Sequence, residues 1–406
     1  MSTLKVNKLR DTAGSADAIT LDPNGGAVLA GVTTVTSVKV GAAVTISESG
    51  IEASGIGITC ASINGTQIGG RRNKIINGGM IVSQRQTSST DSNVFVVDRF
   101  QAQVTQMDEL AQTLEQSSDA PDGFGKSIKI TTTTPESSIA SNEQFRIQTK
   151  LEGQDFQDLV YGSSSAKTIT ISFYVKASVT GTFGFTVYRA ESTARVITAP
   201  YTISSADTWE RKIITIPGDT AGAAITNDTA ERFRLMWGLA AGANFNTASA
   251  SWGNYSSANL LGGHVTNSLV TTNNATWQLA GVQLEVGSQA TPFEHRSYQD
   301  EFQRCERYYE QHEPSNFVMG RYSAGTGNGI NNFKFRTMKR AVPTFTTSGT
   351  FASNSGYAGT PTASYLAPDG CMLLSAASLS ANQIVWLSSS NATYGTRAKI
   401  IFSSEL

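Results

Sequence analysis

The first 94 residues of this sequence contain no aromatic side chain. The 35 aromatic residues, 18 Phe, 12 Tyr and 5 Trp, all lie from Phe95 onward. A segment without Phe, Tyr or Trp has little apolar area to bury, so residues 1–94 are not expected to build a conventional core from one chain. The 406-residue chain therefore divides into two parts of different kind, and its length favours two to four domains.

Charge is also scarce. Asp, Glu, Lys and Arg make up 16% of the residues, and 31 basic and 32 acidic residues leave a formal net charge of -1. That balance provides no basic surface for a phosphate backbone and argues against a nucleic-acid partner. The N-terminus lacks the apolar region of a secretory signal, and no stretch predicts a membrane-spanning helix, so we expect synthesis in a cytoplasm and no membrane insertion.

The sequence shows no spacing typical of a metal site or a disulfide framework. Its three cysteines are far apart in sequence: Cys60, Cys305 and Cys371. Its three histidines are His264, His295 and His312. They form no CxxC, His-x-His or HExxH pattern, and no glycine-rich phosphate-binding loop is present. We predict ordinary thiols, no metal and no cofactor.

The N-terminal part alternates apolar and polar residues. Val38, Val40, Val44 and Ile46 are two or four positions apart, which predicts strands, and frequent glycines predict corners between them. One such chain buries too little to offset about 1 to 2 kcal/mol of backbone entropy per residue. We therefore predict that residues 31–72 form an intertwined β shaft of a homotrimer; a flexible linker is the alternative.

The middle of the chain is predicted to be a jelly-roll β-sandwich over residues 95–296, preceded by a linker or shoulder at 73–94. Strand-like runs recur with polar connections between them, and long helical patterns are absent. The runs are 94–104, 127–132, 168–177, 184–188, 210–216, 232–239 and 277–286. In the last run, Ala280, Val282, Leu284 and Val286 are expected to share one face.

One helix is predicted within residues 297–313. Ser297 is a plausible N-cap with Asp300 three positions later, and the apolar spacing continues to about Gln311. Its aromatic residues could line a ligand groove, but this spacing is more typical of packing between chains or domains. The residues assigned to that packing are Tyr298, Phe302 and Tyr309.

After Pro314 the sequence returns to strand-like runs. These lie near residues 333–337, 344–351, 384–387 and 398–402. They predict a second, smaller β-sandwich over residues 314–406. The fold class is therefore mainly β, with one short helix.

Acidic residues close in sequence are the natural candidates for polysaccharide cleavage, which needs two carboxylates about 5 to 10 Å apart. The candidates are Asp108 with Glu109; Glu152, Asp155 and Asp158; and Asp300 with Glu301. All occur in polar contexts typical of solvated surfaces. We predict no catalytic residue.

A polar loop at residues 245–264 has side chains suited to sugars. Trp252 and Tyr255 offer flat rings on which a sugar could stack, and Asn254 and His264 could bind hydroxyl groups. The alternative is that Trp252 and Tyr255 pack down and anchor the loop. Weaker candidates in the C-terminal part are Tyr357, Tyr365 and Tyr394.

Three stretches resemble bacteriophage tail-fibre proteins. They are residues 73–86 (NKIINGGMIVSQRQ), the triplet Asp98-Arg99-Phe100, and residues 279–309 (LAGVQLEVGSQATPFEHRSYQDEFQRCERYY). The opening MSTLKVNKLRDTAG is similar to the start of short tail-fibre-type proteins of marine cyanophages. The GVQLEVG strand, the ATPFE exit and the CxRYY helix, in that order, are the most specific part of this resemblance.

The resemblance implies a homotrimeric virion protein whose N-terminal segment, residues 1–30, attaches to tail adaptor or nozzle proteins. It also implies jelly-roll domains similar to carbohydrate-binding modules. The expected function is attachment of the tail to a host-cell surface receptor, a glycan, by non-catalytic binding. The alternatives are a structural spacer that carries another receptor-binding protein, and a polysaccharide depolymerase.

Overall fold

The structure is a computed structural model that describes residues 72–313, 329–351, 360–374 and 397–406 in full, and elsewhere only the backbone of strands. Contacts within the chain divide it into two compact units, Met1–Ala61 and Ser62–Leu406. None of the helices in the described ranges is long and apolar enough to cross a membrane.

The described strands of the first unit form two three-stranded antiparallel sheets. One contains β1 (Lys8–Arg10), β2 (Asp17–Leu21) and β3 (Ala27–Leu29), and the other contains β4 (Ser37–Val40), β5 (Val44–Ser47) and β6 (Gly50–Ala53). Register pairs Val38 with Ile46 and Val40 with Val44, so the apolar alternation coincides with strands as predicted. The trimeric shaft concerns contacts between chains and stays a prediction.

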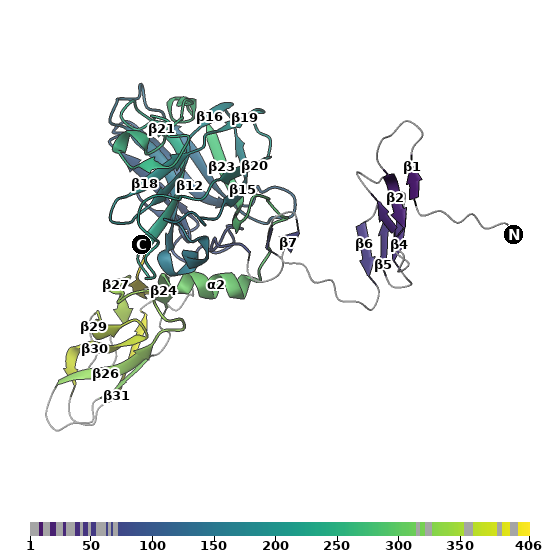
Figure 1. Ribbon diagram of the computed structural model, residues 1–406. Coiled ribbons are helices and arrows are strands. Elements are labelled where there is room, and N and C mark those ends of the chain that lie inside the picture. The colour runs from purple at the N-terminus through teal and green to yellow at the C-terminus, as the bar shows by residue number, and fades with distance from the viewer. Residues whose placement is uncertain are drawn as a thin grey trace. The chain divides into compact units, whose positions relative to one another are not determined.

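The second unit begins with the hairpin β7 (Ser62–Ile63) and β8 (Thr66–Gln67) and continues into two large antiparallel sheets that form the predicted jelly-roll sandwich (Figure 1). In spatial order, the seven-stranded sheet contains β10 (Phe95–Val97), β11 (Phe100–Thr105), β14 (Gln144–Glu152), β21 (Glu231–Ala241), β17 (Phe185–Arg189), β18 (Arg195–Thr198) and β22 (Gly253–Asn254). The six-stranded sheet contains β20 (Glu210–Ile216), β15 (Ile169–Ala177), β23 (Thr276–Val286), β13 (Ser127–Thr134), β12 (Ala111–Ser117) and β9 (Ser88–Ser89). The remaining elements are β16 (Gly181–Phe183), β19 (Tyr201–Ile203), η1 (Gly153–Leu159), η2 (Ser257–Asn259) and α1 (Ser268–Thr271).

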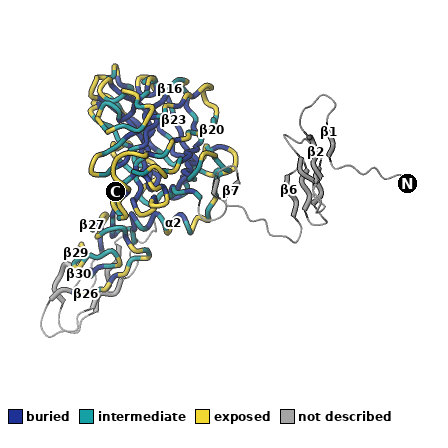
Figure 2. Tube along the Cα trace, in the orientation of Figure 1, coloured by how far each residue is buried: buried dark blue, intermediate teal, exposed yellow. Residues whose placement is uncertain are grey.

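The main core lies between the two sheets, where Figure 2 shows the buried residues gathered. Trp237 lies at its centre, with ring centroids 5.3 Å from Phe185, 5.7 Å from Phe173 and 6.2 Å from Phe100. The predicted strand at 210–216 is confirmed with its bounds. The predicted run at 94–104 is instead two strands, because the chain turns at Arg99, whose φ is 70°.

The last strand of the sandwich, β23, does not present one continuous face. Its register against β15 shifts between Ser172 and Tyr174, and Gly281 adopts a φ of +60° in the same region. This bulge reverses the alternation, so Val282 and Leu284 join the core cluster and Ala280 does not. The prediction that Ala280 shares their face is wrong.

Residues 73–82, which lie in the segment predicted to be a linker or shoulder, pack against the sandwich. Ile75, Met80 and Val82 are fully buried. The Asn73 amide donates to the Val282 carbonyl at 3.2 Å, and the Val282 amide donates to Gly78 at 2.9 Å. The Asn77-Gly78-Gly79 turn and the residues before it therefore pack along the second half of β23, beyond the part that pairs with β13.

The predicted helix is present as α2 (Tyr298–Glu306), and the N-cap is confirmed because the Ser297 hydroxyl accepts from the Asp300 amide at 3.2 Å. It ends five residues before the expected Gln311. The chain turns at Arg307 and continues as β24 (Tyr309–His312), which pairs with a strand near the C-terminus. Strand pairing thus overrides the apolar period that suggested a longer helix.

The C-terminal part forms a three-stranded and a six-stranded sheet around a small core, as predicted. Besides β24 its strands are β25 (Phe317–Gly320), β26 (Gly327–Lys334), β27 (Thr344–Ser348), β28 (Phe351–Ala352), β29 (Thr362–Ala367), β30 (Gly370–Leu379), β31 (Ile384–Ser389) and β32 (Lys399–Ser403). The core contains Phe333, Phe351, Cys371, Leu373, Ala398, Ile400 and Phe402. The run predicted at 333–337 begins where β26 ends, and β29 and β30 were not predicted.

Candidate functional site

The predicted sugar-binding loop contains one residue that cannot serve that purpose. His264 is 2% exposed, and its Nδ1 accepts from the Gly184 amide at 3.1 Å. Burial lowers the pKa of His264 to about 4, so the ring is neutral at physiological pH. His264 fixes the loop to the strands beneath it, and its assignment as a glycan contact is wrong.

The other three loop residues differ in accessibility. The Trp252 indole donates to the Pro217 carbonyl at 2.7 Å, and its ring meets Tyr161 edge to face at 5.9 Å. This packing matches the anchoring alternative for Trp252. Asn254 is exposed and accepts from Arg195 at 3.1 Å, whereas Tyr255 is half-buried.

Tyr255 lies at one end of a polar surface on the seven-stranded sheet that was not predicted from the sequence. Its ring meets Tyr188 of β17 edge to face at 5.1 Å, and the Arg234 guanidinium lies 5.2 Å from the centre of the Tyr188 ring. Tyr188 and Arg234 pair across β17 and β21, and Arg234 pairs with Lys150 of β14. These residues share the face of the seven-stranded sheet that points away from the core.

The same face continues over β14 and β11. Register pairs Gln148 with Gln101 and Arg146 with Gln103. We call the whole set the outer polar face: Gln101, Gln103, Gln144, Arg146, Gln148, Lys150, Tyr188, Arg234 and Tyr255. The period of two in Gln101-x-Gln103 and Gln144-x-Arg146-x-Gln148 is visible in the sequence and could have revealed it.

Side chains of the outer polar face hold one another in place. Arg146 donates to the amide oxygens of Gln148, at 3.0 Å, and of Gln144 and Gln103. Gln148 in turn donates to Gln101 at 2.9 Å. Gln144, Arg146 and Gln148 are buried, while Gln101 and Gln103 are partly exposed at the margin. The face therefore presents the amides of Gln101 and Gln103, whose orientation is fixed by buried neighbours before any ligand arrives.

The charge on this face is only partly compensated. Burial and the neighbouring Arg234 lower the pKa of Arg146 to about 10, so its guanidinium remains protonated at neutral pH. Arg234 is paired with Glu231 at 2.6 Å. Within the described ranges, no carboxylate forms an ion pair with Arg146.

A hollow lies beside the six-stranded sheet, on the opposite side of the sandwich from the outer polar face. Phe124, Phe293 and His295 meet one another with ring centroids 4.9 to 5.2 Å apart, beside Arg296 and Glu301. Arg296 and Glu301 form an ion pair at 2.9 Å, and Glu301 also accepts from the Asn77 amide at 2.6 Å. The Glu301 carboxylate and the terminal nitrogens of Arg296 are thus engaged in structural bonds.

The aromatic residues assigned to packing lie in different environments. Tyr298 is 57% exposed and stacks on Phe302 with centroids 5.9 Å apart, whereas Tyr309 is buried in β24. The face that α2 buries contains Glu301, Cys305 and Glu306 instead of the expected aromatic stripe. Whether Tyr298 and Phe302 contact another chain stays a prediction.

Most of the acidic candidates have structural partners. Glu152 is buried and bound by Arg307 at 2.8 Å, Asp158 pairs with Lys74 at 2.9 Å, and Asp300 pairs with Arg304 at 3.3 Å. Asp108 is different, because it lies with Glu136 and Glu143, which are far from it in sequence. These three could hold a cation.

No protein-family model and no curated protein matches this chain. Solved structures that are similar to it include the enzymatically active domain of tailspike protein 4 of bacteriophage CBA120, with 10% identity and a TM-score of 0.29. The match covers 53% of this chain and 21% of that one, so it spans about a fifth of the tailspike domain.

Two other similar structures are smaller. A family 11 carbohydrate-binding module of a Clostridium thermocellum cellulosomal cellulase has 12% identity and a TM-score of 0.26, and the match covers 53% of this chain and 100% of the module. A xylan-binding domain from Paenibacillus barcinonensis has 12% identity and a TM-score of 0.25, with coverage of 51% and 100%. The sandwich assignment rests on the strand pairing described above and not on these likenesses.

Proposed function

We propose that this chain is a virion protein of the tail-fibre type that attaches to a host-cell surface glycan by non-catalytic binding. The observation that carries the proposal is the outer polar face. The partly exposed amides of Gln101 and Gln103 could donate to and accept from sugar hydroxyls, and Tyr188 and Tyr255 offer partly exposed rings. The buried side chains of Gln144, Arg146 and Gln148 would support these groups from beneath.

The physical argument for binding is preorganisation. Side chains that already bond to one another lose little conformational entropy when a ligand is added. Strands of a sandwich also hold such side chains more rigidly than a loop does. The weak affinity typical of a single glycan site would be raised by three copies in a trimer.

The tail-fibre part of the proposal rests on the sequence resemblance of residues 73–86, 98–100 and 279–309. A homotrimer suits residues 31–72, whose small apolar side chains need partners. Attachment to tail adaptor or nozzle proteins through residues 1–30 follows from the same resemblance. A location in the virion and the absence of catalysis belong to this proposal.

The direct test is a glycan array probed with the whole chain and with the double variant Tyr188→Ala, Tyr255→Ala. We expect the whole chain to bind a defined set of glycans, and the double variant to lose about 2 kcal/mol, roughly thirtyfold in affinity. Phe124→Ala, in the hollow over the opposite sheet, is the matched control and should bind normally.

Other outcomes would contradict particular parts of the proposal. Binding lost in Phe124→Ala and kept in the double variant would place the site in the hollow. No binding to any glycan would favour the spacer, and release of reducing sugar from host polysaccharide would show an enzyme. A monomer in sedimentation would exclude the trimer.

A further inference from the structure

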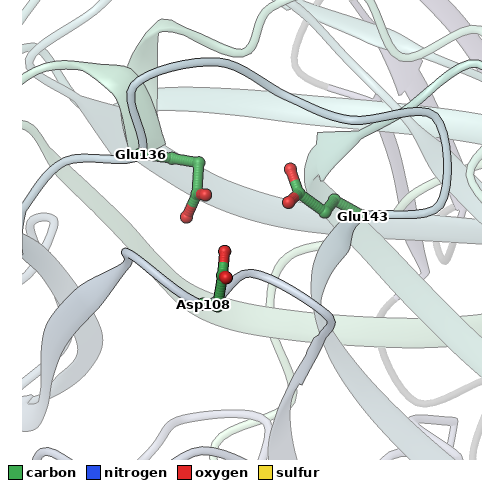
Figure 3. A group of neighbouring side chains, drawn as sticks. All are labelled: Asp108, Glu136 and Glu143. Carbon is green, nitrogen blue, oxygen red and sulfur yellow. The ribbon is translucent and has the colours of Figure 1, made fainter.

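Three carboxylates from two loops meet at one end of the sandwich (Figure 3). Asp108 lies between β11 and β12, and Glu136 and Glu143 lie between β13 and β14. Each side chain offers an oxygen, and these oxygens all lie within 4.8 Å of one another. Figure 3 shows the three carboxylates pointing toward a common space.

The cluster is more than a group of surface acids. Glu136 is 3% exposed and Glu143 is 6% exposed, and only Asp108 lies open to solvent. One carboxylate oxygen of Glu136, Oε2, is buried without a hydrogen-bond partner. A buried, unpartnered carboxylate oxygen is costly, so its presence indicates a ligand that would satisfy it.

The other polar atoms fix the two loops around that oxygen. The Glu143 carboxylate accepts from the Ala140 amide at 2.7 Å, and the Glu136 amide donates to the Val270 carbonyl at 2.9 Å. Neighbouring Glu109 accepts from the Ser137 amide at 2.8 Å, which joins the two loops once more. The carboxylates are therefore held together by the backbone even though their charges repel.

The electrostatics of the cluster favour a cation. Burial, followed by the charges of Glu143, Glu109 and Asp108, raises the pKa of Glu136. Among the described residues, no Lys, Arg or His forms an ion pair with any member of the cluster. A divalent cation would compensate this concentration of like charge and occupy the free coordination position at Glu136.

The ligand set selects the kind of cation. All three ligands are hard oxygens, which suit Ca²⁺ or Mg²⁺ better than Zn²⁺ or copper. Two oxygens on opposite sides of Ca²⁺, each about 2.4 Å from it, are about 4.8 Å apart, whereas Mg²⁺ would need about 4.1 Å. The three oxygens lie within 4.8 Å of one another, a separation that a bound Ca²⁺ can span. Ca²⁺ also accepts flexible sets of protein oxygens, whereas Mg²⁺ retains several waters and is rarely bound by protein ligands alone.

We propose that Asp108, Glu136 and Glu143 form a Ca²⁺ site that ties the β11–β12 loop to the β13–β14 loop. The site joins the two sheets, because β11 and β14 belong to the seven-stranded sheet and β12 and β13 to the six-stranded one. Glu143 directly precedes Gln144, so the ion would also fix one end of the outer polar face. The proposal does not depend on glycan binding.

The test uses the full chain after treatment with a chelator, titrated with CaCl₂ or MgCl₂ by calorimetry and melted with and without Ca²⁺. We expect one Ca²⁺ per chain, weaker Mg²⁺ binding, and a higher melting temperature with Ca²⁺ because the ion binds only the folded state. Glu136→Gln should weaken Ca²⁺ binding about tenfold or more, since affinity depends on the number of charged ligands.

The sign of the stability change separates a metal site from an ordinary structural carboxylate. In chelator, Glu136→Gln should melt at or above the wild-type temperature, because one of three repelling charges is removed. With Ca²⁺ it should melt below wild type. The control Asp122→Asn, which removes an exposed carboxylate outside the cluster, should change neither Ca²⁺ affinity nor this comparison.

Asp108→Asn is the second variant in case Glu136→Gln does not fold, because Asp108 is exposed. It should also weaken Ca²⁺ binding. The proposal is overturned if wild-type protein neither binds Ca²⁺ nor melts higher with it, or if the cluster variants bind Ca²⁺ as wild type does. A variant that melts lower by the same amount with and without Ca²⁺ would show a structural role alone.

Discussion

Replacing Glu152 with alanine should loosen the joint between the sandwich and the C-terminal part. Glu152 ends β14 and is fully buried. Its carboxylate accepts two hydrogen bonds from Arg307, each 2.8 Å long, and one from the Tyr308 hydroxyl at 2.6 Å. Arg307 and Tyr308 connect α2 with β24, so this carboxylate holds both sequence-distant parts together.

The magnitude follows from what the substitution leaves behind. Glu152→Ala leaves the buried Tyr308 hydroxyl without its acceptor and Arg307 without its counterion, and breaking a buried ion pair in this way costs about 3 to 5 kcal/mol. An unfolding entropy of about 2.1 cal/mol/K per residue converts this to roughly 4 to 7 °C for a unit of the size of Ser62–Leu406. Glu152→Gln keeps the shape and one acceptor oxygen, so its loss should be about half as large.

Differential scanning calorimetry of the wild type and both variants measures these shifts. Combining Glu152→Ala with Tyr308→Phe should cost less than the sum of the two single changes, because the hydroxyl no longer needs an acceptor. A loss below about 1 kcal/mol for Glu152→Ala, or full additivity in the double variant, would refute the reasoning and show that this carboxylate is not a buried joint.

Two further predictions concern acid stability and the bulge in β23. Burial alone would raise the pKa of Glu310, but hydrogen bonds from His312 and Lys339 hold it at about 2. The stability it adds is complete above its unfolded value of about 4.5 and is lost as the pH falls toward 2; urea unfolding of Glu310→Gln should therefore depend less on pH across that window, and an unchanged slope would contradict this. Gly281→Ala should cost about 1 to 3 kcal/mol in urea unfolding, because φ is +60° and an added Cβ would lie 2.7 Å from the Phe124 ring. A cost below about 0.5 kcal/mol would mean that the bulge relaxes.

The fold was largely predictable wherever local composition decides a strand. The run 210–216 was predicted with its bounds because β-branched residues are concentrated in its second half and polar connections flank it. In β23, a single bulge at Gly281 reversed the faces, and nothing in the apolar pattern announces that shift. Residues 73–94 were predicted to be a linker or shoulder because the partners of residues 73–82, in β23, lie about 200 residues later in the chain.

The candidate sites were less predictable, for two different reasons. The outer polar face has a period of two in β11 and β14 that is visible in the sequence. It was not predicted, because only loops with aromatic residues were considered as sugar-binding candidates. The carboxylate cluster has no signal in sequence spacing. Asp108, Glu136 and Glu143 meet only because strand register brings the ends of two loops together.

The resemblance to tail fibres also acquires a physical meaning. Its two longer stretches contact each other in the structure. Asn73 and Asn77 from the first bond to Val282 and Glu301 from the second, and Arg296 bonds back to the Ile75 carbonyl at 3.0 Å. The stretches that resemble tail fibres therefore include the contacts that hold residues 73–82 against β23 and α2. This is a structural role.

These contacts between residues 73–82 and residues 282–301 have a consequence for synthesis on the ribosome. Residues 73–82 cannot be buried until Val282 and Glu301 have been synthesised. At a translation rate of about 5 to 20 residues per second, the time between synthesis of the two segments is about 10 to 45 s. During this time Ile75, Met80 and Val82 lie open on a nascent chain. On polysomes such segments lie on neighbouring nascent chains, where exposed apolar side chains favour aggregation until residue 301 has emerged.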